Sequence, residues 1–219
     1  MKLIHRDNYK SYIICLVAFI LSAIAFPHLP EQIAIHFNAQ GIPDGYGSPL
    51  TIFLLPAIML FVNVLAEITK HTDPRKDNYS YFSKHYYLFH LVLNIFLLLV
   101  QLYIISFSLQ IITFSLTNII VIAMGILFII IGNMLPKVKQ NFFMGIKTPW
   151  TLADEYVWYA THRFSGKLWF AFGLIMCVCG FFPNNALIPI ILISAIAAAV
   201  VPMIYSYIIY KRRASTEKK

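Results

Sequence analysis

Long apolar runs divide this 219-residue chain. If each run crosses a membrane, all seventeen lysines and arginines lie on the same side of that membrane. A helix of about 20 residues crosses roughly 30 Å of hydrocarbon, since each residue rises about 1.5 Å. The sequence therefore predicts an all-α, polytopic membrane protein with six transmembrane helices. The predicted spans are Ser11 to Leu29, Leu50 to Thr69, Tyr86 to Ser108, Thr113 to Leu135, Leu168 to Phe182 and Leu187 to Tyr210.

The fifth apolar run is short, because fifteen residues rise only about 22 Å. We expect this helix to extend into Thr161 to Lys167, where Arg163 and Lys167 can snorkel while Trp169 lies at the interface.

Three connections contain no lysine or arginine: Pro30 to Pro49, Leu109 to Ile112 and Pro183 to Ala186. The positive-inside rule therefore predicts that both termini are cytoplasmic. No small-residue cleavage site follows the first helix, so we expect it to be retained as an anchor. With 59% apolar and 12% charged residues, the chain has too little polar surface for a soluble globule. The net charge of +8 fits cytoplasmic loops that contact anionic membrane lipid, and no direct nucleic-acid partner is expected.

The connection from Pro30 to Pro49 is predicted to be an ordered outer loop. Ile33, Ile35 and Phe37 alternate with smaller or polar residues, which predicts a short strand, and Pro43 to Gly45 has the chemistry of a turn. Two interpretations stay open: a lid over the helices, or a docking surface whose acidic charges favour a basic or apolar peptide. The candidate ligand-binding residues are Glu31, His36, Phe37, Asn38, Asp44 and Tyr46.

The second inner connection is rich in aromatic, charged and turn-forming residues. Thr151 followed by Asp154 resembles a capping box, which predicts a helix from Leu152 that lies amphipathically along the inner membrane surface. The segment is either a recognition platform for a cytosolic partner or a structural collar between two helices. The candidate partner-binding residues are Lys147, Pro149, Trp150, Glu155, Trp158 and His162.

Several polar residues fall within the apolar runs, namely Asn63, Glu67, His90, Asn94 and Asn133. Polar groups are costly in lipid, so these side chains are expected to face the bundle interior and to bond between helices. A polar pocket that opens inward and moves a proton or solute is the alternative. Gly125 and Gly132 are predicted to mark close helix contacts.

Catalytic and metal-binding motifs are absent from the sequence. It contains no GxSxG, no Walker loop, no HExxH and no paired-cysteine knuckle, and Glu67 with His71 is the single candidate ligand pair at one-turn spacing. We therefore expect no enzyme activity, no catalytic residue, no metal and no cofactor.

Two stretches carry a family likeness. Ile35-His36-Phe37-Asn38 with Pro43-Asp44-Gly45-Tyr46-Gly47-Ser48 resembles the N-terminal domain of unknown function that precedes the SdpI domain. Gly145-Ile146-Lys147-Thr148-Pro149-Trp150-Thr151-Leu152, with Trp158 and Thr161-His162-Arg163, resembles the SdpI domain itself. The resemblance implies a division into a two-helix unit, residues 1–69, and a four-helix unit, residues 70–219.

The resemblance also implies a function. Members of the SdpI family are immunity proteins of the bacterial cell membrane that protect the producer against a secreted membrane-active toxin peptide, the sporulation-delaying protein. Signalling through sequestration of a cytosolic transcriptional repressor is the second implied role. A small transporter or channel remains the alternative, and the family carries over no catalytic residues.

Overall fold

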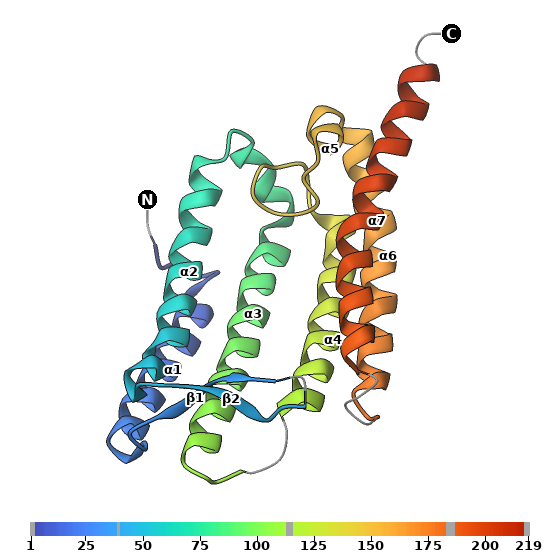
Figure 1. Cartoon of the computed structure of the whole chain (residues 1–219). Coiled ribbons are helices and arrows are strands. Elements are labelled where there is room, and N and C mark those ends of the chain that lie inside the picture. Colours follow the sequence, from blue (N-terminus) through green and yellow to red (C-terminus); the bar gives the residue numbers. More distant parts are fainter. Residues whose placement is uncertain (1–2, 39, 113–115, 183–186, 217–219) are drawn as a thin grey trace.

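The computed structural model describes residues 3–38, 40–112, 116–182 and 187–216 (Figure 1). The start expected at Thr113 and the connection Pro183 to Ala186 lie outside the described residues. The long helices are α1 (Tyr9–Ala25), α2 (Leu54–Thr72), α3 (Tyr79–Ser108), α4 (Leu116–Met134), α6 (Glu155–Cys179) and α7 (Leu187–Thr216). The short elements are β1 (Ile33–Phe37), β2 (Pro43–Gly47), α5 (Pro149–Ala153) and the 3-10 turns η1 (Phe26–His28), η2 (Pro49–Phe53), η3 (Lys76–Asn78) and η4 (Leu135–Lys137).

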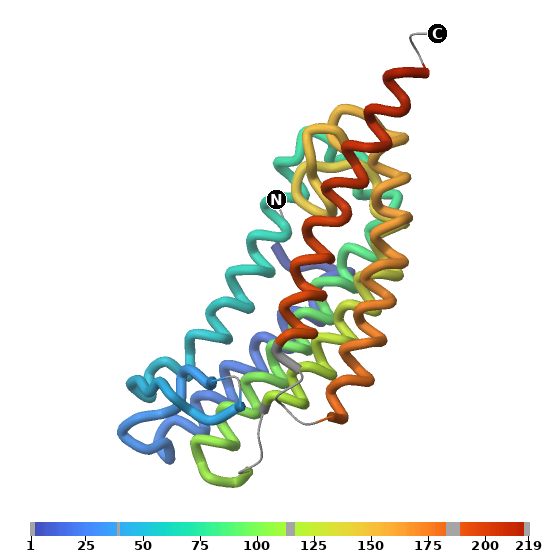
Figure 2. The backbone as a smooth tube through the Cα atoms, turned by 45° about the vertical axis from the view of Figure 1, so that its right-hand side comes forward, coloured from blue at the N-terminus to red at the C-terminus, as the bar shows by residue number. Residues whose placement is uncertain are grey.

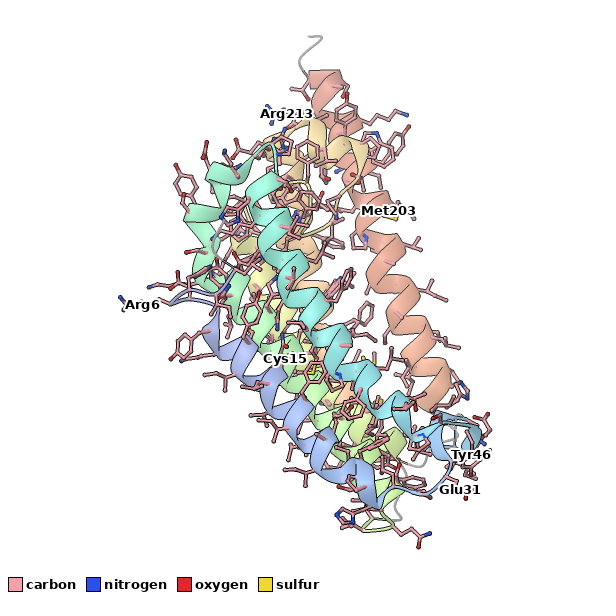
Figure 3. All side chains as sticks on the ribbon, turned by 90° about the vertical axis from the view of Figure 1, so that its left-hand side faces the viewer. Arg6, Cys15, Glu31, Tyr46, Met203 and Arg213 are labelled. Atoms are coloured by element: carbon pink, nitrogen blue, oxygen red, sulfur yellow. The ribbon has the colours of Figure 1, made fainter. Side chains whose placement is uncertain are left out.

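The long helices form two groups that lie side by side (Figures 1 and 2). The first group is α1, α2 and α3, the second is α4, α6 and α7, and packing of α3 on α4 joins them. The β-hairpin lies at one end of the molecule, while α5 and the C-terminal end of α7 lie at the other. We call these the hairpin end, which carries Glu31 and Tyr46, and the basic end, which carries Arg213 (Figure 3).

Among the described residues, five segments are long and apolar enough to cross a membrane, which confirms the predicted class of a helical membrane protein. They are Tyr9–His28, Pro49–Thr72, Lys76–Ser108, Thr117–Lys137 and Pro189–Thr216. The helix α6 is not among them, since Arg163 and Lys167 lie in its first half. Its 25 residues rise about 37 Å beside α4 and α7, and it extends beyond Thr161 as expected.

Glycines allow α4 and α6 to pack closely, as the sequence predicted for Gly125 and Gly132. A Cβ at Gly132 would lie 2.7 Å from the carbonyl oxygen of Gly166, and one at Gly125 would lie 2.8 Å from that of Gly173. A side chain at these positions would push the helices apart. The backbones of α4 and α6 are therefore in direct contact at these glycines.

The hairpin confirms the strand expected at Ile33 to Phe37, but the turn predicted at Pro43 to Gly45 is wrong. The chain reverses earlier, where the Gly41 backbone N–H donates to the Asn38 carbonyl oxygen (2.8 Å) and Gly41 has φ 74°. Residues 43–45 belong to β2, which pairs antiparallel with β1. Gly45 lies opposite His36, where a Cβ would come within 2.9 Å of the histidine Cβ, so this glycine serves the strand pairing.

The predicted helix start at Thr151 to Asp154 also differs from the structure. The capping box joins Thr148 and Thr151, and it begins the single turn of α5. Asp154 then acts as a separate N-cap, because its side chain accepts hydrogen bonds from the Tyr156 and Val157 backbone N–H groups. No separate amphipathic helix occurs among residues 116–182; that face belongs to the first turns of α6.

Candidate functional site

A groove of about 600 Å³ lies at the hairpin end, between the hairpin and the end of α3. Its lining combines backbone, apolar and amide groups from the two strands and from the turn after α3. The lining residues are Pro30, Gln32, Ile33, Ala34, Tyr46, Phe107, Ser108, Gln110 and Ile112. Such a concave, largely apolar surface with a few polar groups is typical of a ligand site.

One wall of the groove is a strained helix end. Gln110 has φ 58°, a left-handed conformation that usually requires glycine. The Gln110 and Ile111 backbone N–H groups donate to the carbonyl oxygens of Phe107 (3.0 Å) and Ser106 (2.9 Å), which completes a Schellman motif. Glycine would form this motif without strain, so the glutamine side chain is retained at a conformational cost of about 1–2 kcal/mol.

The six ligand-binding residues predicted at the outer loop differ in their surroundings. Tyr46 is 58% exposed and lines the groove. Phe37 packs its ring against Tyr103 and Phe107, with centroids 6.0 and 5.4 Å apart, which fixes the hairpin to α3. Asn38 is structural, because its side-chain oxygen accepts hydrogen bonds from two turn N–H groups, those of residues 40 and 42.

The remaining three predicted residues are exposed acidic or imidazole side chains. His36 Nδ1 lies 2.5 Å from Asp44 Oδ1 across the two strands. Glu31 precedes β1 and is exposed. Since no lysine or arginine of the chain lies between residues 11 and 69, the described hairpin presents only negative fixed charge.

At the basic end, the loop between η4 and α5 is locked to the connection between α2 and α3. Asp73 is buried, and its carboxylate accepts hydrogen bonds from the Tyr79 hydroxyl (3.0 Å), the Phe142 N–H (2.8 Å) and the Arg75 N–H (2.7 Å). Asn141 is fully buried, and its side-chain oxygen accepts from two further N–H groups of the loop. We give the name loop lock to the set of Asp73, Tyr79, Asn141, Gln140, Trp158 and His162.

Trp158 and His162, predicted as partner-binding, belong to the loop lock. They are 2% and 1% exposed, and their rings stack with centroids 4.0 Å apart. Trp158 Nε1 donates to the Val138 carbonyl oxygen (2.8 Å), and His162 Nε2 accepts from the Ile146 N–H (3.0 Å). His162 Nδ1 lies 2.8 Å from the Trp158 carbonyl oxygen, so the ring is neutral with its proton on Nδ1.

The other predicted inner residues lie at the surface. Lys147, Pro149 and Glu155 are exposed, and Trp150 is half-buried against the Tyr207 ring, with centroids 5.0 Å apart. The structure thus divides the six candidates into two that hold the loop and four that are accessible at the basic end.

Only some of the predicted intramembrane polar residues bond to one another in the described structure. Asn63 and Asn94 exchange reciprocal side-chain hydrogen bonds of 3.1 and 2.8 Å between α2 and α3. Asn133 is not part of this pair; it is exposed and donates to the Ile129 carbonyl oxygen of its own helix. His90 packs edge-on against Tyr86. These residues therefore do not form one shared pocket.

Glu67 lies in a cluster that the sequence did not reveal. Its side chain is 1% exposed, Oε1 accepts a hydrogen bond from Asn8 Nδ2 (2.8 Å), and Oε2 lies 3.3 Å from His5 Nε2. His5 Nε2 also lies 3.1 Å from the Tyr87 hydroxyl. The only sequence signal for this contact was a histidine and an asparagine placed before the first helix. In the part of the chain that the structure describes, no three His, Cys, Asp or Glu side chains gather as metal ligands.

Comparison with known proteins gives consistent matches along the chain. The SdpI/YfhL protein family matches residues 137–206, and a domain of unknown function, DUF1648, matches residues 13–60. A relative from Bacillus subtilis (strain 168), named Immunity protein SdpI, is 31% identical over 209 residues, which cover 94% of this chain and 97% of the relative. No solved structure matches.

Proposed function

Because this chain belongs to the SdpI/YfhL protein family and is a multi-pass protein of the cell membrane, we propose that it is an immunity protein that intercepts a secreted, membrane-active toxin peptide. In this proposal α6 is the sixth transmembrane span. Both termini lie in the cytoplasm, since the lysines and arginines gather away from the hairpin end. The hairpin end then faces outward.

The groove beside the hairpin carries the proposal. A peptide that attacks membranes is apolar or cationic, and the groove offers apolar walls, an exposed Tyr46 ring and a surface whose fixed charges, Glu31 and Asp44, are acidic. Phe37 anchors the hairpin to α3 and Gln110 is held in place by the Schellman motif, so the groove is preformed. A preformed site binds with less loss of conformational entropy.

The protein offers a smaller accessible surface to a cytosolic partner, such as a transcriptional repressor. The exposed side chains of Lys147, Pro149 and Glu155, with the half-buried Trp150, are its proposed contacts. Transport of a solute receives no comparable support, since Asn63 and Asn94 use their side-chain amides on each other.

The test is to produce the protein in a toxin-sensitive bacterial strain that lacks its own immunity protein, and to challenge it with the secreted sporulation-delaying toxin. The wild-type chain should raise the toxin concentration needed to stop growth. Tyr46→Ala should cost about 2 kcal/mol of binding, as expected for an aromatic anchor, and so lower protection about thirtyfold.

Ile42→Ala is the matched control. Ile42 is 59% exposed on the same hairpin, nearly the same as Tyr46 at 58%, but it does not line the groove. Both variants should reach wild-type abundance in the membrane. Equal protection by the two variants would remove the groove from the proposal, and absence of protection by the wild-type chain against a panel of secreted membrane-active peptides would reject the immunity role.

A further inference from the structure

A second pocket, of about 370 Å³, lies far from the groove, where the N-terminal segment and the start of α1 meet α3. Its lining is divided by chemistry. Three cationic side chains, one carboxylate and two hydroxyls form the rim, and aromatic or aliphatic side chains form the wall. The lining residues are Arg6, Asp7, Lys10, Ser11, Ser83, Lys84, Tyr87, Leu88 and Leu91.

The rim has an excess of positive charge. Arg6, Lys10 and Lys84 are exposed, and none of them forms an ion pair within the described residues, whereas Asp7 contributes a single negative charge. Like charges that converge without partners repel one another, so an anion between them stabilises the arrangement. Ser11 and Ser83 place hydroxyl donors at the same rim.

The wall below the rim is apolar. Leu88 and Leu91 follow Lys84 along α3 by four and seven residues, which places them on the same face and one to two turns deeper. The pocket thus runs from cations to hydrocarbon along a helix that qualifies as a membrane span. A free inorganic anion would use only the rim, whereas a phospholipid would use both parts.

The buried Glu67 holds the pocket in shape. Asn8 donates to Glu67 Oε1 and also to the Leu3 carbonyl oxygen (2.8 Å each), so residues 3–8 are fastened to α2. His5 bridges Glu67 and Tyr87, and Tyr87 itself lines the pocket. Arg6 is thereby presented toward Lys84 and toward Lys10 at the start of α1, instead of being carried on a free tail.

We propose that this pocket binds one anionic glycerophospholipid of the cytoplasmic leaflet, with its phosphate between Arg6, Lys10 and Lys84 and an acyl chain along Leu88 and Leu91. The leaflet follows from the positive-inside orientation, and basic pockets between membrane helices are suited to anionic headgroups. The site is independent of toxin capture.

The experiment is native mass spectrometry of the full chain, purified in a mild detergent and titrated with phosphatidylglycerol, with phosphatidylcholine or with inorganic phosphate. Wild-type protein should retain one phosphatidylglycerol in preference to phosphatidylcholine, and phosphate should not compete at equal concentration. Each cation removed should weaken phosphatidylglycerol binding about fivefold, so Arg6→Ala, Lys10→Ala and Lys84→Ala together should remove the retained lipid.

The matched control removes three other exposed lysines, Lys76, Lys137 and Lys211, and should keep the preferred lipid. Asn8→Ala provides a second line of evidence, because it keeps all three cations but releases the segment, and it should also weaken retention. Equal retention by the pocket triple and the control triple, equal binding of phosphatidylcholine, or full competition by phosphate would each overturn the proposal.

Discussion

Replacement of His162 by alanine tests whether this residue holds the loop lock together or belongs to a recognition surface. The change leaves the Ile146 N–H without its acceptor, and a buried donor without a partner costs about 1–3 kcal/mol. Because Ile146 is half-buried, the lower half of this range applies. Loss of the ring stack on Trp158 adds about 0.5–1.5 kcal/mol, for a total of roughly 1.5–3.5 kcal/mol.

For a chain of this length, that loss corresponds to a fall in Tm of roughly 3–14 °C, which thermal unfolding of the purified protein in detergent would measure. His162→Gln should recover part of the loss, because a carboxamide oxygen can accept from the Ile146 N–H. Glu155→Ala is the control: its carboxylate is 73% exposed and lies 4.0 Å from Lys139 Nζ, so its loss should change Tm by no more than about 1–2 °C.

Assays in cells should distinguish the two variants in the same way as Tm does. His162→Ala should lower abundance in the membrane, toxin protection and any recruitment of a repressor in parallel, whereas Glu155→Ala should affect repressor recruitment alone. An unchanged Tm and abundance for His162→Ala, together with lost recruitment, would refute the reasoning and return His162 to a contact role.

Three further outcomes are expected. Gln110→Gly should stabilise the protein by about 1 kcal/mol through relief of left-handed strain, seen as a higher Tm, yet weaken toxin protection because the groove loses a side chain. Gly132→Leu should cost at least about 1–3 kcal/mol and reduce membrane abundance, whereas the neighbouring Asn133→Ala should not, since that side chain is exposed. In a background without the three native cysteines, Gln40→Cys should react with an impermeant maleimide in intact cells and Lys139→Cys should not; labelling at Lys139 would reject the six-span orientation.

The sequence predicted features that depend on local pattern. Apolar length predicted membrane helices, alternation predicted the strand Ile33 to Phe37, and the spacing of Gly125 and Gly132 predicted a close helix contact, whose partner in the structure is α6. Each of these signals lies within one element. Each follows from geometry that neighbouring residues impose on one another.

Features that depend on distant partners were not predictable in this way. The turn was placed at Pro43 to Gly45 by turn chemistry, but the Asn38 side chain forms the turn and Gly45 is required by the approach of His36. Trp158 and His162 looked like surface recognition residues because nothing in the sequence shows that residues 138–146 fold over them. The groove wall at Gln110 lies in the four-residue connection Leu109 to Ile112, which carries no sequence signal of its own.

The hairpin end and the basic end differ in whether their polar groups already have hydrogen-bond partners. This difference limits how ligand binding at one end can affect the other. At the groove, the Tyr46 ring is exposed and Gln110 is strained, so a ligand has contacts to gain. At the loop lock, the carboxylate of Asp73 already has three donors. Within the described residues, α3 alone among the elements that line the groove also reaches the lock. It contributes Phe107 to the groove and Tyr79 to the lock, about 42 Å apart along the helix.

Coupling between toxin capture and a cytosolic partner would therefore have to pass through α3 or through movement of the two helix groups against each other. The helix is interrupted at Phe82, whose φ of −131° and ψ of 20° are not helical, so Tyr79 and the lock lie beyond a kink from the rest of α3. A rotation of α3 caused at the groove would be absorbed at that kink before it reached Asp73, because the lock side is held by its own hydrogen bonds. Relative movement of the two helix groups is thus the more direct route, and such a movement must change both contacts that join the groups, the packing of α3 on α4 and the loop lock.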